Sequence, residues 1–168
     1  MMSLSEKIVA NRQKRNWMQM HEDIQDRHLA DSVVRQIYYP ESSHLLKTVL
    51  KNMHDGHWQK ASYLPSSADY EVQLTTRLAA LSHREKTVLC FFPDYSARMD
   101  GVISELPILE VAGTVIDKWY QFAKGKALYF FLCSSTDLLN GVALDVYEAD
   151  PVVHHTAGAV CDLYTWSA

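Results

Sequence analysis

The chain has 168 residues, the length of one ordinary domain, and 48% of them are hydrophobic, which excludes disorder of the whole chain. Six Gly and five Pro are too few for a fibrous or low-complexity protein. Sixteen Lys and Arg against twenty Asp and Glu give a net charge of −4, which excludes a uniformly basic nucleic-acid coat protein.

The first 60 residues have the pattern of helices. Ser3 and Glu6 form a capping-box sequence ahead of an apolar stripe. A second helical stretch is predicted over 17–37 and ends before Pro40, because proline interrupts helical hydrogen bonding. A third helix is predicted over 42–55, where apolar residues recur at helical spacing.

The next segment, 70–82, is ambiguous. Tyr70, Val72 and Leu74 alternate as in a strand, whereas Tyr70, Leu74, Leu78 and Leu81 fit one face of a helix. The length of the segment favours the helix. Both interpretations stay open at this point, and the size of any sheet depends on the outcome.

From residue 87 onward the pattern changes to strands around one helix. Strands are predicted, in chain order, over 87–92, 101–104 with 107–111, 127–133, 142–146 and 160–166, and the helix over 114–124. The run 127–133 is almost wholly apolar, which is typical of a central strand covered on both faces. We therefore predict a single α+β domain over 1–168. A helical N-terminal half (about 3–82) packs on a small mixed or antiparallel sheet (about 87–168) that carries one further helix.

The lack of a signal-peptide pattern, the short apolar runs and the positions of the cysteines favour a cytoplasmic protein without a membrane segment. Charged residues interrupt the N-terminal stretch where a signal peptide has an apolar core. The longest apolar run is far shorter than the ~20 residues that cross a bilayer. Cys90, Cys133 and Cys161 are widely spaced and lie among apolar residues, so we expect buried, reduced thiols.

The C-terminal quarter is acidic and rich in aromatic residues. Residues 127–168 contain five Asp and Glu and no Lys or Arg. Such a segment is suited to a partner with a basic surface, because complementary charge steers association and aromatic side chains anchor interfaces. The candidate partner-binding residues are Asp145, Tyr147, Glu148, Asp150, Asp162, Tyr164 and Trp166. The alternative is that these carboxylates only solvate strand ends and turns.

A second hypothesis rests on acidic residues in the middle of the chain. Asp100 and Glu110 precede a helix and an apolar strand, an order that resembles the core of the PD-(D/E)xK nucleases. The resemblance implies that two acids hold a divalent cation that activates water on a phosphodiester. It departs from the family at Ala112, where the family has a lysine. Lys118 on the following helix is the candidate replacement.

Histidines suggest a weaker, third candidate site. His21 and His28 are two helical turns apart, and His54 and His57 flank the end of another predicted helix. A transition metal would need three or four of these side chains to converge. Their charged neighbours are typical of a solvated helix face, so we expect no metal and no cofactor.

We accordingly favour a non-enzymatic protein of the antitoxin, immunity or adaptor type, which binds and neutralises or regulates a macromolecular partner. The expected partner is a protein with a basic surface and not a nucleic acid. Four Trp and nine Tyr also leave enough aromatic area for a homodimer.

Overall fold

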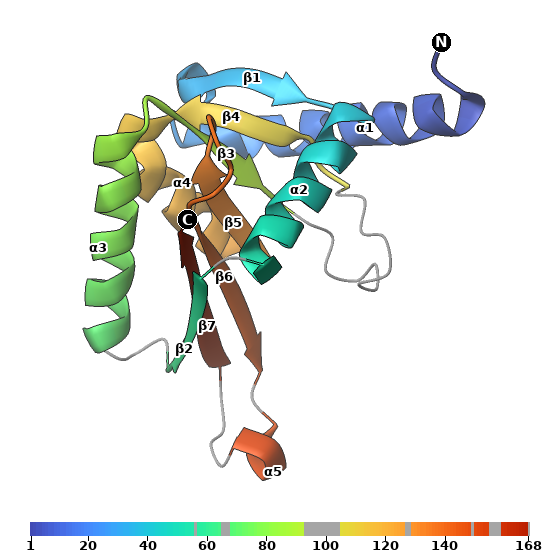
Figure 1. Cartoon of the computed structure of the whole chain (residues 1–168). Coiled ribbons are helices and arrows are strands. Elements are labelled where there is room, and N and C mark those ends of the chain that lie inside the picture. Colours follow the sequence, from blue (N-terminus) through green and yellow to red (C-terminus); the bar gives the residue numbers. More distant parts are fainter. Residues whose placement is uncertain are drawn as a thin grey trace.

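The computed structural model describes residues 1–55, 57–64, 68–92, 105–126, 129–148, 150–154 and 159–167. In chain order the elements are α1 (Leu4–Asp26), a 3-10 turn (Ala30–Ser32), β1 (Val33–Ile37), α2 (Glu41–Asp55), β2 (His57–Tyr63), α3 (Ala68–Arg84), β3 (Thr87–Phe91), β4 (Ile108–Ala112), a 3-10 turn (Gly113–Val115), α4 (Ile116–Lys126), β5 (Tyr129–Ser134), β6 (Gly141–Glu148), α5 (Pro151–His154) and β7 (Ala159–Ser167). Figure 1 shows their arrangement.

The described strands form one seven-stranded sheet in the order β1-β4-β3-β5-β6-β7-β2. Every pairing between them is antiparallel. The predicted α+β class is thus confirmed, and β5, which holds the apolar run, is the middle strand. The sheet is larger than the small one predicted, because the N-terminal half contributes two strands of its own.

Helices cover both faces of the sheet. The larger core gathers apolar side chains of α1, α3 and α4 against one face, which we call the three-helix face. The smaller core packs Leu46 and Val49 of α2 on the other face, the α2 face, against Leu89, Phe91 and Phe131. In Figure 1, α2 lies in front of the sheet and α1 and α4 lie behind it.

The prediction that the first 60 residues are helical throughout was wrong at β1 and β2. These two strands are the two edges of the sheet. Most of their side chains are exposed or half-buried, and β1 also carries an irregularity in its pairing between Val33 and Arg35. Edge strands whose side chains are mostly exposed to solvent lack the alternation of apolar and polar residues by which a strand is recognised in a sequence.

The second predicted helix, over 17–37, was wrong after Asp26: residues 17–26 are helical as part of α1, and β1 follows at Val33. His28 adopts a left-handed backbone with φ of 56°. Its N–H donates to Gln25 O at 2.9 Å, and the N–H of Leu29 donates to Ile24 O at 3.1 Å. This is the Schellman pattern, and Ile24 and Leu29 complete it as members of the larger core.

The other helices agree better with the predictions made from the sequence. The Ser3–Glu6 capping box is present, with the Ser3 N–H donating to Glu6 Oε2 at 2.6 Å. The ambiguous segment 70–82 is helical and lies within α3, whose Leu74, Leu78 and Leu81 are buried. The helix expected at 114–124 is α4, preceded by the 3-10 turn. The expected strand at 101–104 lies outside the described residues.

Candidate functional site

Two of the predicted partner-binding carboxylates face each other inside the sheet. Asp145 on β6 is the direct cross-strand partner of Asp162 on β7. Only 7% of Asp145 and 2% of Asp162 is exposed. Both lie in phase with Ala143 and Tyr164, and therefore on the α2 face. The expectation that these two acids present an outer surface does not hold in this structure.

Strand β2 supplies the polar partners of Asp162. Lys60 Nζ lies 2.8 Å from Asp162 Oδ2, and the Ser62 hydroxyl donates to Oδ1 at 2.6 Å. The hydrogen bond to Asp162 raises the pKa of Lys60 above its ordinary value. The carboxylate is thus held by two donors from the neighbouring strand, as a buried charge requires.

Aromatic rings flank this polar cluster. Lys60 Nζ lies 5.6 Å from the centroid of the Tyr164 ring, and burial raises the pKa of the Tyr164 hydroxyl. Trp58 on β2 packs on Tyr164 with ring centroids 6.0 Å apart, and Trp58 is the exposed member of the pair. Lys60 therefore combines an ion pair with a cation–π contact, which fixes β2 on β7.

Trp166 is also buried, contrary to its expected place at the surface. It pairs with Gly141 across β6 and β7, and a Cβ at position 141 would overlap the indole ring. The Trp166 ring thus belongs to the smaller core. Its Nε1 has no hydrogen-bond partner within the described part of the chain.

The exposed part of the predicted surface lies at the end of the β6–β7 hairpin. Asp150 is exposed, and its Oδ1 accepts the Val152 N–H at 2.9 Å, which caps α5. Val152 and Val153 on α5 are 82% and 67% exposed. Figure 1 shows α5 at the far end of the hairpin, away from the other helices. We call Asp150, Pro151, Val152 and Val153 the hairpin tip. Tyr147 and Glu148 lie on β6 close to it in sequence, but their side chains are outside the described residues.

The acidic pair expected for a nuclease is not assembled by the described residues. Glu110 accepts a hydrogen bond from Thr87 Oγ1 at 2.8 Å and another from Arg35 Nε at 3.3 Å, so both of its oxygens have structural partners. It lies on the α2 face, in phase with Ile108, whereas Lys118 is exposed on α4, which packs on the three-helix face. Asp100 lies outside the described residues.

The histidines of the weaker metal hypothesis are spread over the fold. His21 packs beside Trp17 on α1, at a centroid distance of 5.5 Å, and His28 terminates that helix. His54 is at the end of α2, on the opposite face of the sheet, and His57 begins β2 with its side chain outside the described residues. No group of three His, Cys, Asp or Glu side chains arranged to bind a metal occurs in the described ranges.

The chain matches no family model, no curated protein and no solved structure. None of the described helices combines the length and apolar character needed to span a bilayer. The described residues form an α+β fold with a seven-stranded antiparallel sheet.

Sequence reasoning missed the contribution of β2 and the exposure of the hairpin tip. No role was predicted for Lys60 or Ser62, because only the pairing of β2 with β7 brings them to Asp162. The signal for the tip was present in the sequence. Asp150-Pro151 is a helix-start pattern, and the two valines that follow have no apolar stripe to join.

Proposed function

We propose that this protein is a non-enzymatic binding protein, of the antitoxin, immunity or adaptor type, that recognises a protein partner through its hairpin tip. The observation that carries the proposal is the exposure of Val152 and Val153, 82% and 67%, at the end of a hairpin that extends away from the helices. Two adjacent exposed apolar side chains on a projecting element are suited to insertion into a partner's apolar depression.

Charge defines the partner further. The segment 127–168 has five acidic residues and no Lys or Arg, and Lys60, the cation that β2 adds, is already paired with Asp162. Asp145 and Asp162 are buried and Asp162 is paired with Lys60, so among the described residues of the hairpin the exposed Asp150 supplies the negative charge beside the apolar tip. A basic protein surface surrounding an apolar groove complements it, because charge speeds encounter and apolar burial slows dissociation. Nucleic acid is disfavoured, since its phosphates require cations.

Two further features support the non-enzymatic role and the cytoplasmic location that we propose. Glu110 accepts hydrogen bonds from Thr87 and Arg35, which suits a structural role better than metal binding. Cys90 and Cys133 are buried free thiols, which accords with a reducing compartment, and we place the protein in the cytoplasm.

The experiment is a quantitative affinity purification of the tagged protein from its source cells. The tip variant is Val152→Ser with Val153→Ser, which removes apolar surface without changing charge. The matched control is Val34→Ser with Val72→Ser, two exposed valines on β1 and α3. The proposal predicts a protein with a basic surface whose recovery falls roughly tenfold with the tip variant only, and whose purified form binds less tightly as salt rises. Equal recovery with both variants, or recovery only of a second copy of this chain, would contradict it.

A further inference from the structure

A cleft on the three-helix face lies between α3 and the edge of the sheet formed by β2, β7 and the start of β6. Its volume is about 310 Å³, which is the size of a small-molecule site. Its polar lining residues are Gln59, Arg77, Arg84, Asn140, Thr165 and Ser167. We call it the α3 cleft, and Figure 1 shows α3 beside β2 and β7.

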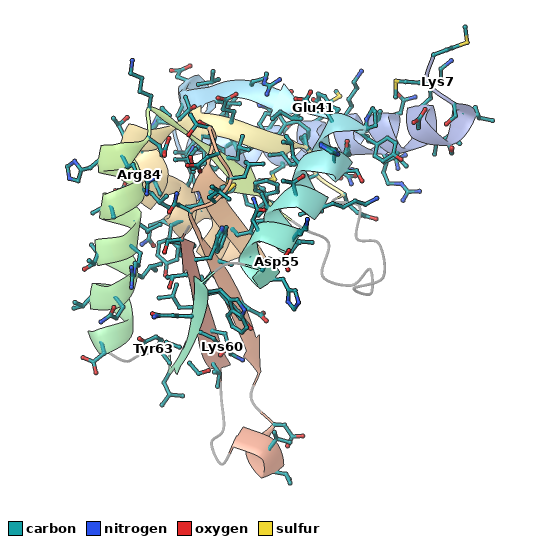
Figure 2. The ribbon with its side chains drawn as sticks, in the orientation of Figure 1. Lys7, Glu41, Asp55, Lys60, Tyr63 and Arg84 are labelled. Atoms are coloured by element: carbon teal, nitrogen blue, oxygen red, sulfur yellow. The ribbon has the colours of Figure 1, made fainter. Side chains whose placement is uncertain are left out.

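Helix α3 brings two cations to a cleft whose other walls include β6 and β7, which contain no Lys or Arg. Arg77 and Arg84 are seven residues apart, so they lie on the same helix face about 10 Å apart along the axis. Ala80 and Leu81 line the cleft between them, and the small Ala80 side chain leaves room there. Both arginines are exposed, and the ion pair of Arg84 with Glu85 is long, at 3.8 Å. Their guanidinium groups are therefore available to a ligand. Figure 2 shows Arg84 at the end of α3.

The sheet side of the cleft adds uncharged hydrogen-bonding groups. Thr165 and Ser167 are in phase with Leu163, and Gln59 is the cross-strand partner of Thr165, so all three lie on the face that α3 covers. None of the described lining residues is a carboxylate. A cleft with two cations, several hydrogen-bond donors and no acid has the chemistry of an anion site.

Asn140 gives an independent indication of a missing ligand. It is 8% exposed, it lines the cleft, and it lies in phase with Val142 and Leu144, which face α3. Its Nδ2 has no hydrogen-bond partner within the described residues. Buried side-chain amides in folded proteins are nearly always paired, so an orphaned donor on a residue that lines a cationic cleft indicates that an acceptor belongs beside it.

From this juxtaposition we infer that the α3 cleft binds a small phosphorylated ligand, with the phosphate held by Arg77, Arg84 and Asn140. Donors approach the cleft from the helix on one side and the sheet on the other. A tetrahedral phosphate offers oxygens in both directions, whereas a single planar carboxylate offers two oxygens in one plane. The apolar part of the ligand would rest on Ala80, Leu81 and Val142. This site is separate from the hairpin tip and does not depend on the proposed partner.

The test is titration of the full-length protein at constant ionic strength, followed by calorimetry and by NMR of the Asn140 side-chain amide. The probes are inorganic phosphate, pyrophosphate, adenosine monophosphate, adenosine and citrate. The inference predicts saturable binding of at least one phosphate probe, a shift of the Asn140 amide signals, and no binding of adenosine. Arg77→Gln and Arg84→Gln each weaken binding at least about tenfold, because each removes a charge-assisted contact. Arg15→Gln, which removes an exposed arginine of α1, leaves it unchanged.

Three results would overturn the inference. One is the absence of saturable binding with every phosphate probe. Another is equal weakening by Arg15→Gln, which would mean diffuse attraction to net charge. The third is citrate binding as tightly as pyrophosphate, which would show a general anion surface without phosphate geometry. Because all three variants alter exposed side chains, their folding is checked by the melting temperature in the absence of ligand.

Discussion

Lys60 on β2 donates a hydrogen bond to Asp162 on β7 over 2.8 Å, and Asp162 is almost completely buried. A buried carboxylate that loses its cation keeps the cost of desolvation without the compensating charge. Replacement of Lys60 by Met, which keeps most of the aliphatic stem and removes the charge, should lower the free energy of unfolding by about 1–3 kcal/mol, towards the low end because the lysine is partly exposed to solvent.

Urea denaturation at pH 7 measures this change. The matched control is Lys51→Met, which alters an exposed lysine of α2. The control should remain within about 0.5 kcal/mol of the parent protein. If both variants lose the same stability, the pairing with Asp162 does not contribute as described.

The same cluster predicts a loss of stability at alkaline pH. The pKa of Lys60 is raised above 10.5, mainly by its hydrogen bond to Asp162, and the pKa of Tyr164 is raised above 10.0, mainly by burial. Each group holds its proton more tightly in the folded state, so its contribution is complete below its unfolded pKa and is lost as pH rises through its folded pKa. The free energy of unfolding should therefore fall with pH from about pH 10 upward. Denaturation curves between pH 9 and 11 test this, and the slope should be shallower in Lys60→Met and in Tyr164→Phe. A slope that neither substitution changes would assign the alkaline loss to other groups.

Gly141 is required because the Trp166 ring occupies the place of its side chain. A Cβ at this position would overlap the indole and would lie 2.6 Å from Leu132 O. Gly141→Ala should destabilise the protein by about 1–3 kcal/mol, since the overlap involves a ring and a backbone atom in a packed core. A thermal denaturation series with Gly141→Ala, Trp166→Leu and the double variant measures the coupling. The double variant should be less destabilised than the sum of the single variants, and strict additivity would contradict the contact.

Gln13 connects α1 to the start of α2. It is fully buried, accepts the Tyr39 N–H at 2.7 Å and donates to Ser42 Oγ at 3.2 Å. Gln13→Leu leaves these groups unpaired in a buried place, and we expect a loss of about 1–3 kcal/mol. Gln19→Leu, at an exposed position of the same helix, is the control for helix propensity. In chemical denaturation, Gln13→Leu should unfold at a clearly lower denaturant concentration than Gln19→Leu, and similar midpoints for the two variants would refute this role of Gln13.

The buried thiols should be inert until the protein unfolds. Cys90 and Cys133 are completely buried, and burial raises the pKa of both thiols. Thiolate is the reactive form, so access and ionisation both oppose modification. In a Cys161→Ser background, a thiol reagent such as DTNB should react only at the rate of unfolding. A fast phase in native buffer would contradict the burial of these residues.

The central strands were predictable because their side chains are almost all buried. Every side chain of β3 after Thr87 is buried, as are those of β5 from Phe131 to Ser134, so an apolar run identifies each strand. The edge strands β1 and β2 were missed because exposure removes that pattern. The end of α1 was missed because it depends on the left-handed backbone of His28, a residue with no strong sequence signal for that conformation.

The candidate site was less predictable than the fold, because its contacts join distant segments. Ser62 and Asp162 are 100 residues apart in sequence, and they meet because β2 pairs with β7. Composition identified the acidic segment correctly but could not distinguish the buried Asp145 and Asp162 from the exposed Asp150. The cationic wall of the α3 cleft likewise comes from a helix outside that segment.

Site-specific photo-crosslinking at the hairpin tip tests the central claim most directly. A photoreactive amino acid is placed at Val152, or at the exposed control position Val34 on the edge strand β1, and intact source cells are irradiated. We predict one defined crosslinked species from position 152, containing a protein with a basic surface, and none of it from position 34. Crosslinks that are absent from position 152, or that are the same from both positions, would show that the tip is not the binding surface.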